Sequence, residues 1–475
     1  MTSSYRVPSQ NVPRLVLGLL AVALGLLAGK DAEVALAITA ALVFIAVLLS
    51  DYTLAVGIFF VTTFLALPGT VAKGIGMVLV LAWIAMMTTH SGREFQDFAL
   101  AHKGTTGLLL AFVAWTLLGV AWASSPSAVL TAEGRYIPNF VVFFIVYAAA
   151  GKRSNSVALI AFFVLGASMA AAYGVIHPPA ASGSDLARDG GTLGDPNYFA
   201  TVLVAALALA SALAIMRSLA PLWRVAAIVA CVLSVSGILL SLSRGGLIAL
   251  GVALLTSVLI GGRWRVPMAA VTVFVAIAAV GYFFALAPPG ALQRITTNND
   301  GSGRNDIWTV GWRMVKAHPL NGVGAGNFSL VSKNYVLQPG LTTHADYIIL
   351  VPKVAHNTYL EVLAEGGIPA LLLFMAIIVG SLRCTQKAWL AFRRSGDEEL
   401  ELLAYAQFAA LVGFLAGSIF LSEEYSKQLW ILLAFGPLLL RVSRLPAPIR
   451  QRARVPAPLR RGSYRAGMSA AARAV

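Results

Sequence analysis

The sequence predicts an all-α protein whose helices cross a membrane many times. Of its 475 residues 58% are hydrophobic and only 12% are charged, whereas a soluble domain carries about a quarter charged residues. Apolar runs long enough to cross the hydrocarbon core as helices recur along the chain. A transmembrane barrel would show weak alternating segments instead. We therefore predict a polytopic helical bundle with about 12 to 14 spans.

The apolar runs divide the chain into four parts. Predicted spans lie near residues 14–29, 33–50, 52–68, 74–89, 105–123, 138–150, 156–176, 198–216, 224–242, 245–260, 267–287, 367–383, 402–421 and 428–443. The predicted parts are membrane helices at 1–287, a long loop with short interfacial helices at 288–356, further membrane helices at 357–444 and a basic tail at 445–475. Further spans follow the first apolar run, so we expect an uncleaved helix there rather than a signal peptide.

Lysine and arginine in the connections predict the orientation. If the N-terminus is cytoplasmic, alternate connections carry basic clusters, for example Lys152 with Arg153. The opposite connections are not rich in basic residues. This pattern places both termini in the cytoplasm. It places on the outer, periplasmic face the loops 124–137, 177–197 and 288–356 and the tight turn SLSRGG at 241–246.

The net charge of +15 favours a membrane surface over nucleic acid. Much of the excess lies in the tail RVSRLPAPIRQRARVPAPLRRGSYRAG, and basic clusters beside a membrane are attracted to anionic lipid. No aromatic or folded nucleic-acid module accompanies these charges. Cys231 and Cys384 lie within or at the ends of apolar runs, which argues against a structural disulfide.

Three arginines are predicted to face the outer compartment. Arg244 lies in the SLSRGG turn, Arg304 in the long loop and Arg188 in the Gly- and Asp-rich loop before both. A guanidinium binds phosphate oxygens through paired hydrogen bonds and stays charged in a low dielectric, so these residues predict a diphosphate site. The alternatives are arginines that only anchor helix ends and, for Arg188, a salt bridge to Asp185 or Asp189.

His356 is the predicted general base, because histidine commonly serves that role near neutral pH. We expect it to begin the helix HNTYLEVLAEGGIP, which returns the chain to the membrane; a hydrogen-bonding residue at a helix start is the alternative role. Glu361 and Glu365 follow one helical turn apart, where they either orient the base or acceptor or lie on a solvated face. The six histidines show no paired spacing, so we expect no metal and no cofactor.

Two further segments of the long loop have a predicted structure. Residues 305–316 are expected to form an interfacial helix with Trp308, Trp312 and Val315 on one face, ended by HPLNG. NGVGAGNF at 321–328 follows a helix and lacks the Lys-Ser/Thr of a phosphate-binding loop. We therefore predict a turn that packs closely against the bundle.

An ordered series of motifs resembles the O-antigen ligase and O-antigen polymerase superfamily of bacterial inner-membrane glycan transferases. The series is GTLGDPNYFA at 191–200, SLSRGG at 241–246, RNDIW with HPLNGVGAGNF at 304–328, and HNTYLEVLAEGGIPALLLF at 356–374. The series covers about the second half of the chain. The first half is similar only in consisting of hydrophobic spans.

The resemblance implies a C-type glycosyltransferase that uses an undecaprenyl-diphosphate-linked glycan at the periplasmic face. Arg244 and Arg304 would bind the diphosphate, and His356 would act as the base or orient the acceptor. The further substrate-binding candidates are Arg188, Asp195, Asn197, Trp308 and Glu365. For Asp195 and Asn197, the role is either structural or substrate-lining.

The acceptor stays open, because these motifs serve the shared donor. Transfer to lipid A-core would make the protein a ligase, which we expect first. Transfer to another lipid-linked repeat would make it an O-antigen or exopolysaccharide polymerase, and some relatives glycosylate protein serine or threonine. The rival from another class is a transporter of polysaccharide precursors. A transporter would place charges and broken helices near the membrane midplane, whereas the predicted charges gather in the outer loops.

Overall fold

The computed structural model describes residues 22, 25–26, 28–67, 69–89, 98–178, 187–296, 303–336, 338 and 345–445. Every regular element in these segments is helical. Residues 446–475 of the predicted basic tail, and most of the first predicted span, lie outside the described residues.

Eight helices in this part of the chain are long and apolar enough to cross a membrane, so the protein is an all-α, multi-pass membrane protein. All the described α-helices, whether or not they are long enough to cross a membrane, are α2 (Ala32–Ser50), α3 (Tyr52–Thr62), α4 (Gly69–Thr89), α6 (Lys103–Leu118), α7 (Pro126–Ala149), α8 (Arg153–Ile176), α9 (Pro196–Ile215), α10 (Pro221–Leu240), α11 (Arg244–Ile260), α12 (Arg265–Ala285), α13 (Ala291–Thr296), α14 (Arg304–Ala317), α15 (Phe328–Val336), α16 (Ala345–Leu350), α17 (Thr358–Ser395), α18 (Glu398–Gly417) and α19 (Lys427–Ser443). Short 3₁₀ turns add η1 (Gly119–Ala121), η2 (Gly191–Leu193), η3 (Gly262–Trp264) and η5 (Ser418–Phe420).

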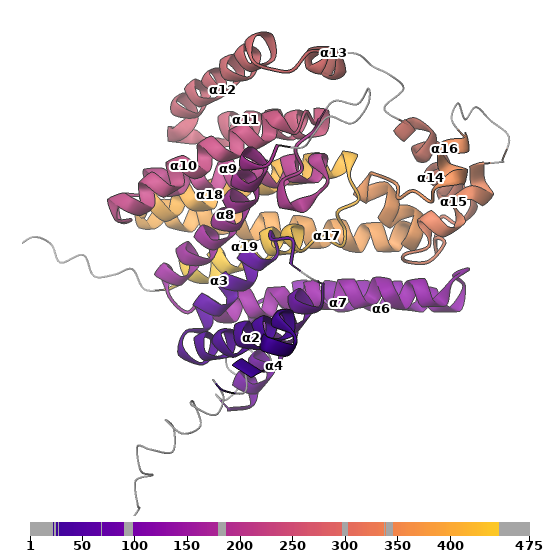
Figure 1. The fold of residues 1–475 in the computed structure, drawn as a ribbon, viewed down its shortest axis with the longest axis horizontal. Coiled ribbons are helices and arrows are strands. Elements are labelled where there is room, and N and C mark those ends of the chain that lie inside the picture. The colour runs from indigo at the N-terminus through magenta and orange to yellow at the C-terminus, as the bar shows by residue number, and fades with distance from the viewer. Residues whose placement is uncertain are drawn as a thin grey trace, which may run out of the picture.

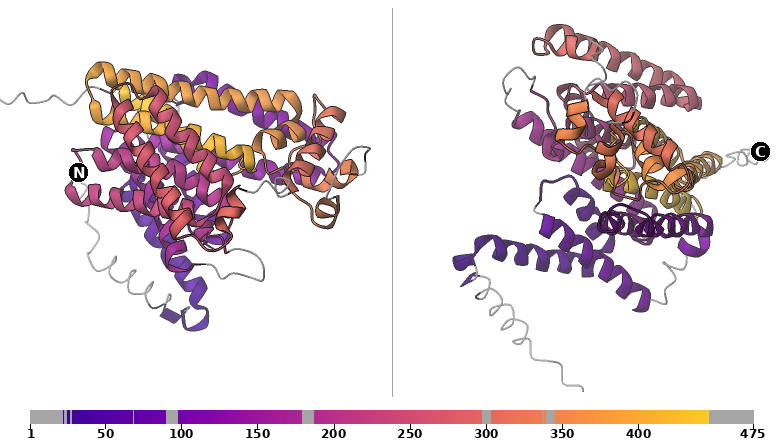
Figure 2. Two further views of the ribbon diagram at one scale, coloured as in Figure 1. Left: turned by 90° about the horizontal axis from the view of Figure 1, so that it is seen from above. Right: turned by 90° about the vertical axis from the view of Figure 1, so that its right-hand side faces the viewer.

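The long helices form one bundle with a small cap at one end. Helices α2 and α4 lie at one edge and α12 at the opposite edge, with α9, α17, α18 and α19 between them (Figures 1 and 2). The short helices α14, α15 and α16 gather beyond one end of the long helices (Figure 1). The cap therefore contains the loop helices from Arg304 onward, whereas α13, earlier in the same loop, lies beside α12 (Figure 1).

Side chains complete the backbone hydrogen bonding where proline interrupts a helix. Pro437 lies inside α19 and has no N–H to donate to the carbonyl of Leu433. The hydroxyl of Ser381, on α17, donates to that carbonyl at 2.6 Å. An unpaired carbonyl in a lipid-surrounded bundle would cost several kcal/mol, so this contact fixes α17 against α19.

The predicted loop 124–137 is wrong, because α7 already begins at Pro126. Ser125 caps this helix by accepting the N–H of Ala128, and Pro126 occupies the first helical position, where its missing N–H costs nothing. Glu133 interrupts the apolar run in the sequence, yet its side chain is buried. Hydropathy therefore placed the helix start too late.

Helix α17 breaks at Gly367, which has φ 69° and ψ −172°. Two carbonyls before the break have no N–H partner within the helix. N–H groups of the turn after α14 donate to them instead. Val323 N–H donates to Ala364 O at 2.9 Å, and Gly324 N–H donates to Glu365 O at 2.8 Å. In return, Ile368 N–H donates to Pro319 O at 2.9 Å. The predicted close packing of NGVGAGNF is thus confirmed.

The predicted stripe of α14 is only partly buried, because Trp308 packs against the same core as Val315 whereas Trp312 does not. Val315 is buried, whereas Trp312 is 53% exposed. The buried stripe also contains Ile307, Val310 and Met314. These side chains pack with α15 and the start of α17 in a small second core, so the contact with neighbouring helices sets the inward face of α14.

Replacing Gly367 with alanine should destabilise the protein strongly. Its backbone conformation is essentially restricted to glycine, and an added Cβ would lie 2.1 Å from Leu320 O. We expect a cost on the order of 3 kcal/mol, read as a lower thermal midpoint by tryptophan fluorescence in detergent. The matched control is Gly251→Ala on α11, where an added Cβ meets nothing within 4 Å. Equal midpoints for the two variants would contradict the interpretation of the break.

Candidate active site

Arg188 joins two segments that are distant in the sequence, the loop before α9 and the turn after α10. Its Nη2 donates to Asn197 Oδ1 at 2.8 Å, and its Nε donates to Ser241 O at 3.1 Å. Ser243 Oγ donates to the same Asn197 oxygen at 2.8 Å. These bonds lock the loop before α9 to the turn that carries Arg244.

The salt-bridge alternative for Arg188 finds no support in these contacts. Asp189 Oδ1 instead accepts the N–H of Gly191 at 2.7 Å, and Asp185 lies outside the described residues. Asp195 caps α9 by accepting the N–H groups of Asn197 and Tyr198 at 2.7 and 2.9 Å. Asp195 and Asn197, both in the motif GTLGDPNYFA, therefore hold the loop before α9 in place.

Three more arginines lie within electrostatic range of Arg188. The pKa of Arg188 is lowered to about 10, first by burial and then by the charge of Arg294, with Arg304 and Arg244 adding to the shift and Asp195 opposing it. Arg188 still carries its proton at neutral pH. All four arginines are half-buried. Gathering like charges costs free energy that a bound anion would offset, so the cluster is suited to an anionic ligand.

Arg294 is the member of this cluster that sequence analysis missed. It lies on the short helix α13, in a stretch with no distinctive motif. One signal could have identified it. Like Arg244 and Arg304, it is a basic residue on the face predicted to be outside, where such residues are depleted.

His356 precedes α17 in a strained backbone conformation with φ 48°. Asn357 caps the helix by accepting the N–H groups of Tyr359 and Leu360, so α17 begins at Thr358 and not at His356 as predicted. A positive φ is uncommon for residues other than glycine and is often found at functional sites. The turn that carries Arg244 contains a second case, Leu242, also with φ 48°.

Two side chains hold the residue just before His356. Trp308 Nε1 donates to Ala355 O at 3.1 Å, and Glu361 Oε2 accepts the N–H of Ala355 at 3.1 Å. Ser422 Oγ also donates to Glu361 Oε2. These contacts fix the strained backbone from both sides. They give Trp308 and Glu361 a positioning role, and a direct substrate contact by Trp308 stays a prediction.

Glu365 is buried rather than solvated and holds the cap against α17. Its Oε1 accepts the N–H of Phe328 at 3.0 Å, and its Oε2 accepts the N–H of Gly326 at 2.8 Å and the hydroxyl of Tyr425 at 3.2 Å. The solvated-face alternative is therefore wrong for this residue, and for Glu361, which is 3% exposed. Substrate binding by Glu365 stays a prediction.

Charges around His356 favour its neutral form. Burial lowers the pKa of His356, Arg304 and Lys353 lower it further, and Asp195 opposes them. A neutral imidazole can accept a proton, which is what a general base requires. The shared electrostatic partners Arg304 and Asp195 also place His356 beside the arginine cluster.

The cluster and His356 lie where several helices begin. Arg244 and Arg304 are the first residues of α11 and α14, Asn197 lies in the first turn of α9, and His356 precedes α17. The start of a helix carries partial positive charge and N–H donors, which favour a bound anion. Four guanidinium groups and the starts of several helices thus lie near the imidazole of His356, which can act as a base when it is neutral.

A family model described as O-antigen ligase matches residues 229–375. The chain is therefore similar to the O-antigen ligase family over this segment. The match confirms the resemblance that the motifs within residues 229–375 indicate. A search of curated proteins found no match to the chain. The matched segment includes Arg244, Arg294, Arg304 and His356. Arg188, the fourth arginine of the cluster, and its partner Asn197 lie outside it.

The pKa of His356 should lie below its ordinary value of 6.5 and should rise when Arg304 is replaced. Arg304→Gln removes a positive charge that disfavours the imidazolium form, so the histidine should bind its proton at a higher pH. NMR titration of isotope-labelled histidine, assigned with His356→Gln, measures this pKa. Arg313→Gln, on the same helix with its guanidinium on Tyr335 O, is the control. A pKa that Arg304→Gln leaves unchanged would contradict the electrostatic account.

Proposed function

We propose that the protein is a glycosyltransferase that moves a glycan from a polyprenyl diphosphate, of the undecaprenyl type, to an acceptor hydroxyl. The observation that carries the proposal is the cluster of Arg188, Arg244, Arg294 and Arg304 beside a neutral His356. A diphosphate is the leaving group that such a cluster suits. The chemistry requires no metal or cofactor if the guanidinium groups supply the positive charge.

The arginines would act on the leaving group. When the bond between the anomeric carbon and the diphosphate oxygen breaks, negative charge develops on the phosphate oxygens. Fixed guanidinium groups stabilise that charge without reorganising, and one such donor contributes about 10²–10³-fold to the rate. Arg188 is fixed by Asn197 and Ser241, which supports this preorganised role.

His356 would act on the acceptor. The acceptor oxygen forms a bond to the anomeric carbon as its hydroxyl proton passes to the neutral imidazole, a contribution of about 10²–10⁴-fold. The diphosphate departs from the opposite side, so a direct displacement inverts the anomeric centre. The strained backbone at His356, held by Trp308 and Glu361, supports a fixed position for the base.

Lipid A-core is the acceptor we propose first, which makes the protein an O-antigen ligase at the periplasmic face of the bacterial inner membrane with cytoplasmic termini. A polymerase of O-antigen or exopolysaccharide is the alternative, since it would use the same donor and the arginine cluster and His356 would serve it equally. A precursor transporter is disfavoured because the arginines lie in loops and at helix starts rather than near the middle of spans.

Deleting the gene in its host and separating the lipopolysaccharide by gel electrophoresis tests this function. We expect long-chain glycan to be lost from lipid A-core and to accumulate on the lipid carrier. Complementation with the wild-type gene or with Arg313→Gln should restore long-chain glycan on lipid A-core. Complementation with Arg304→Ala or His356→Ala should not restore it. Immunoblotting should show that both alanine variants reach the membrane in normal amounts.

Other gel patterns decide among the alternatives. Core that carries a single repeat unit would identify a polymerase. Repeat units that build up facing the cytoplasm would identify a transporter and overturn the enzyme. Full restoration by both alanine variants would refute the assigned roles of Arg304 and His356.

A further inference from the structure

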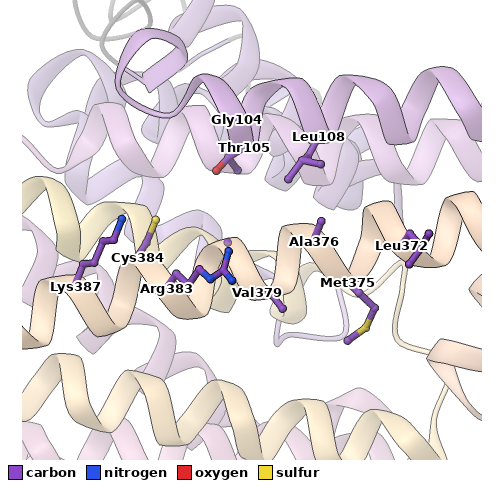
Figure 3. A pocket seen from close by; sticks show the side chains of 11 residues that line it. Gly104, Thr105, Leu108, Leu372, Met375, Ala376, Val379, Arg383, Cys384 and Lys387 are labelled. Carbon is purple, nitrogen blue, oxygen red and sulfur yellow. The ribbon is translucent and has the colours of Figure 1, made fainter.

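A groove of about 530 Å³ lies between α6 and α17, away from the arginine cluster. The two helices touch directly at Trp115, whose Nε1 donates to Gly366 O at 2.7 Å. Toward the start of α6 they leave a hollow that Gly104 and Thr105 line from one side (Figure 3). Its volume is within the range of about 300–1,000 Å³ that binds small ligands.

Most of the groove is apolar. Leu108 projects into it from α6, and Ala376 faces it from α17 (Figure 3). Leu372 and Val379 extend the same wall and are 64% and 37% exposed. Such a surface, on a helix that crosses the membrane, is suited to a hydrocarbon chain rather than to a polar ligand.

One end of the groove is strongly basic. Arg383 and Lys387 lie one helical turn apart and point from α17 toward α6 (Figure 3). The first turn of α6 lies opposite, and its N-cap residue His102 makes no side-chain capping bond, so this end also presents backbone N–H groups. None of the described residues that line the groove is acidic.

The basic end lies far along α17 from His356. Arg383 follows the break at Gly367 by 16 residues, roughly 24 Å of regular helix at 1.5 Å per residue, and residues 358–366 add further length before the break. The hydrocarbon core of a bilayer is about 30 Å thick. A ligand at Arg383 therefore cannot reach the arginine cluster and belongs to the other leaflet.

We propose that this groove is a binding site for one anionic phospholipid of the leaflet opposite His356. The headgroup phosphate would contact Arg383 and Lys387, and an acyl chain would lie along Leu108, Leu372 and Ala376. A charge at one end of a hydrocarbon chain is the chemistry that the groove complements. The proposal does not depend on the glycan-transfer function.

Native mass spectrometry of the purified full-length protein, titrated with dioleoyl-phosphatidylglycerol or dioleoyl-phosphatidylcholine, tests the site. Wild type should bind the anionic lipid about tenfold more tightly than the zwitterionic one, and Arg383→Gln with Lys387→Gln should remove that preference. Ala376→Phe should weaken binding of the anionic lipid by filling the apolar part while leaving both cations.

The matched control removes the same charge elsewhere on α17. Arg393→Gln with Arg394→Gln changes two exposed residues in its last turn and should keep wild-type preference. Equal binding of the two lipids by wild type would overturn the proposal, as would an equal loss in this control. A dimer that Ala376→Phe dissociates would also overturn it, because a second copy would then occupy the groove. If the variant at Arg383 and Lys387 fails to fold, two measurements still test the proposal: the preference of wild type for the anionic lipid, and the binding of that lipid by Ala376→Phe.

Discussion

The structure depends on the hydrogen bonds that the turn after α14 makes with the broken helix α17. Gly367 ends the regular helix, and the N–H groups of Val323 and Gly324 take the carbonyls that the break leaves. The carboxylate of Glu365 adds two bonds to the backbone of the same segment. These contacts attach the loop that carries Arg304 to the helix that His356 precedes. The spacing between the two functional groups therefore follows from the break.

The site concentrates positive charge, and neighbouring groups offset part of the repulsion among the arginines. Arg188 donates to Asn197 and Ser241, so part of the repulsion among the arginines is offset by fixed acceptors. Asp195 supplies an opposing charge to both Arg188 and His356. Burial raises the pKa of Glu423, a hydrogen bond with Ser426 opposes the shift, and the nearby Asp195 and Glu361 carboxylates add to it. These effects disfavour a further negative charge at Glu423.

Sequence patterns predicted the helices well and the contacts poorly, for a physical reason. Hydropathy is a local property, and the spans predicted at 156–176 and 198–216 match α8 and α9 closely. Arg294 was missed because its significance comes from three arginines distant in the sequence. The sequence left Glu365 open between a role at the site and a solvated face, because its partners, the N–H groups of residues 326 and 328, come from another segment. Periodicity also could not show that Trp312 is exposed while Val315 on the same side of α14 is buried, since packing decides how far the buried surface extends.

The most direct test of this account is a structure of the protein in a lipid nanodisc with undecaprenyl diphosphate bound. We predict that both phosphates lie among the guanidinium groups of Arg188, Arg244, Arg294 and Arg304, within hydrogen-bond distance of at least two of them. The imidazole of His356 should then face the terminal phosphate, on the side where the glycan would be attached. A diphosphate bound away from these arginines, or with His356 turned away from it, would contradict the account.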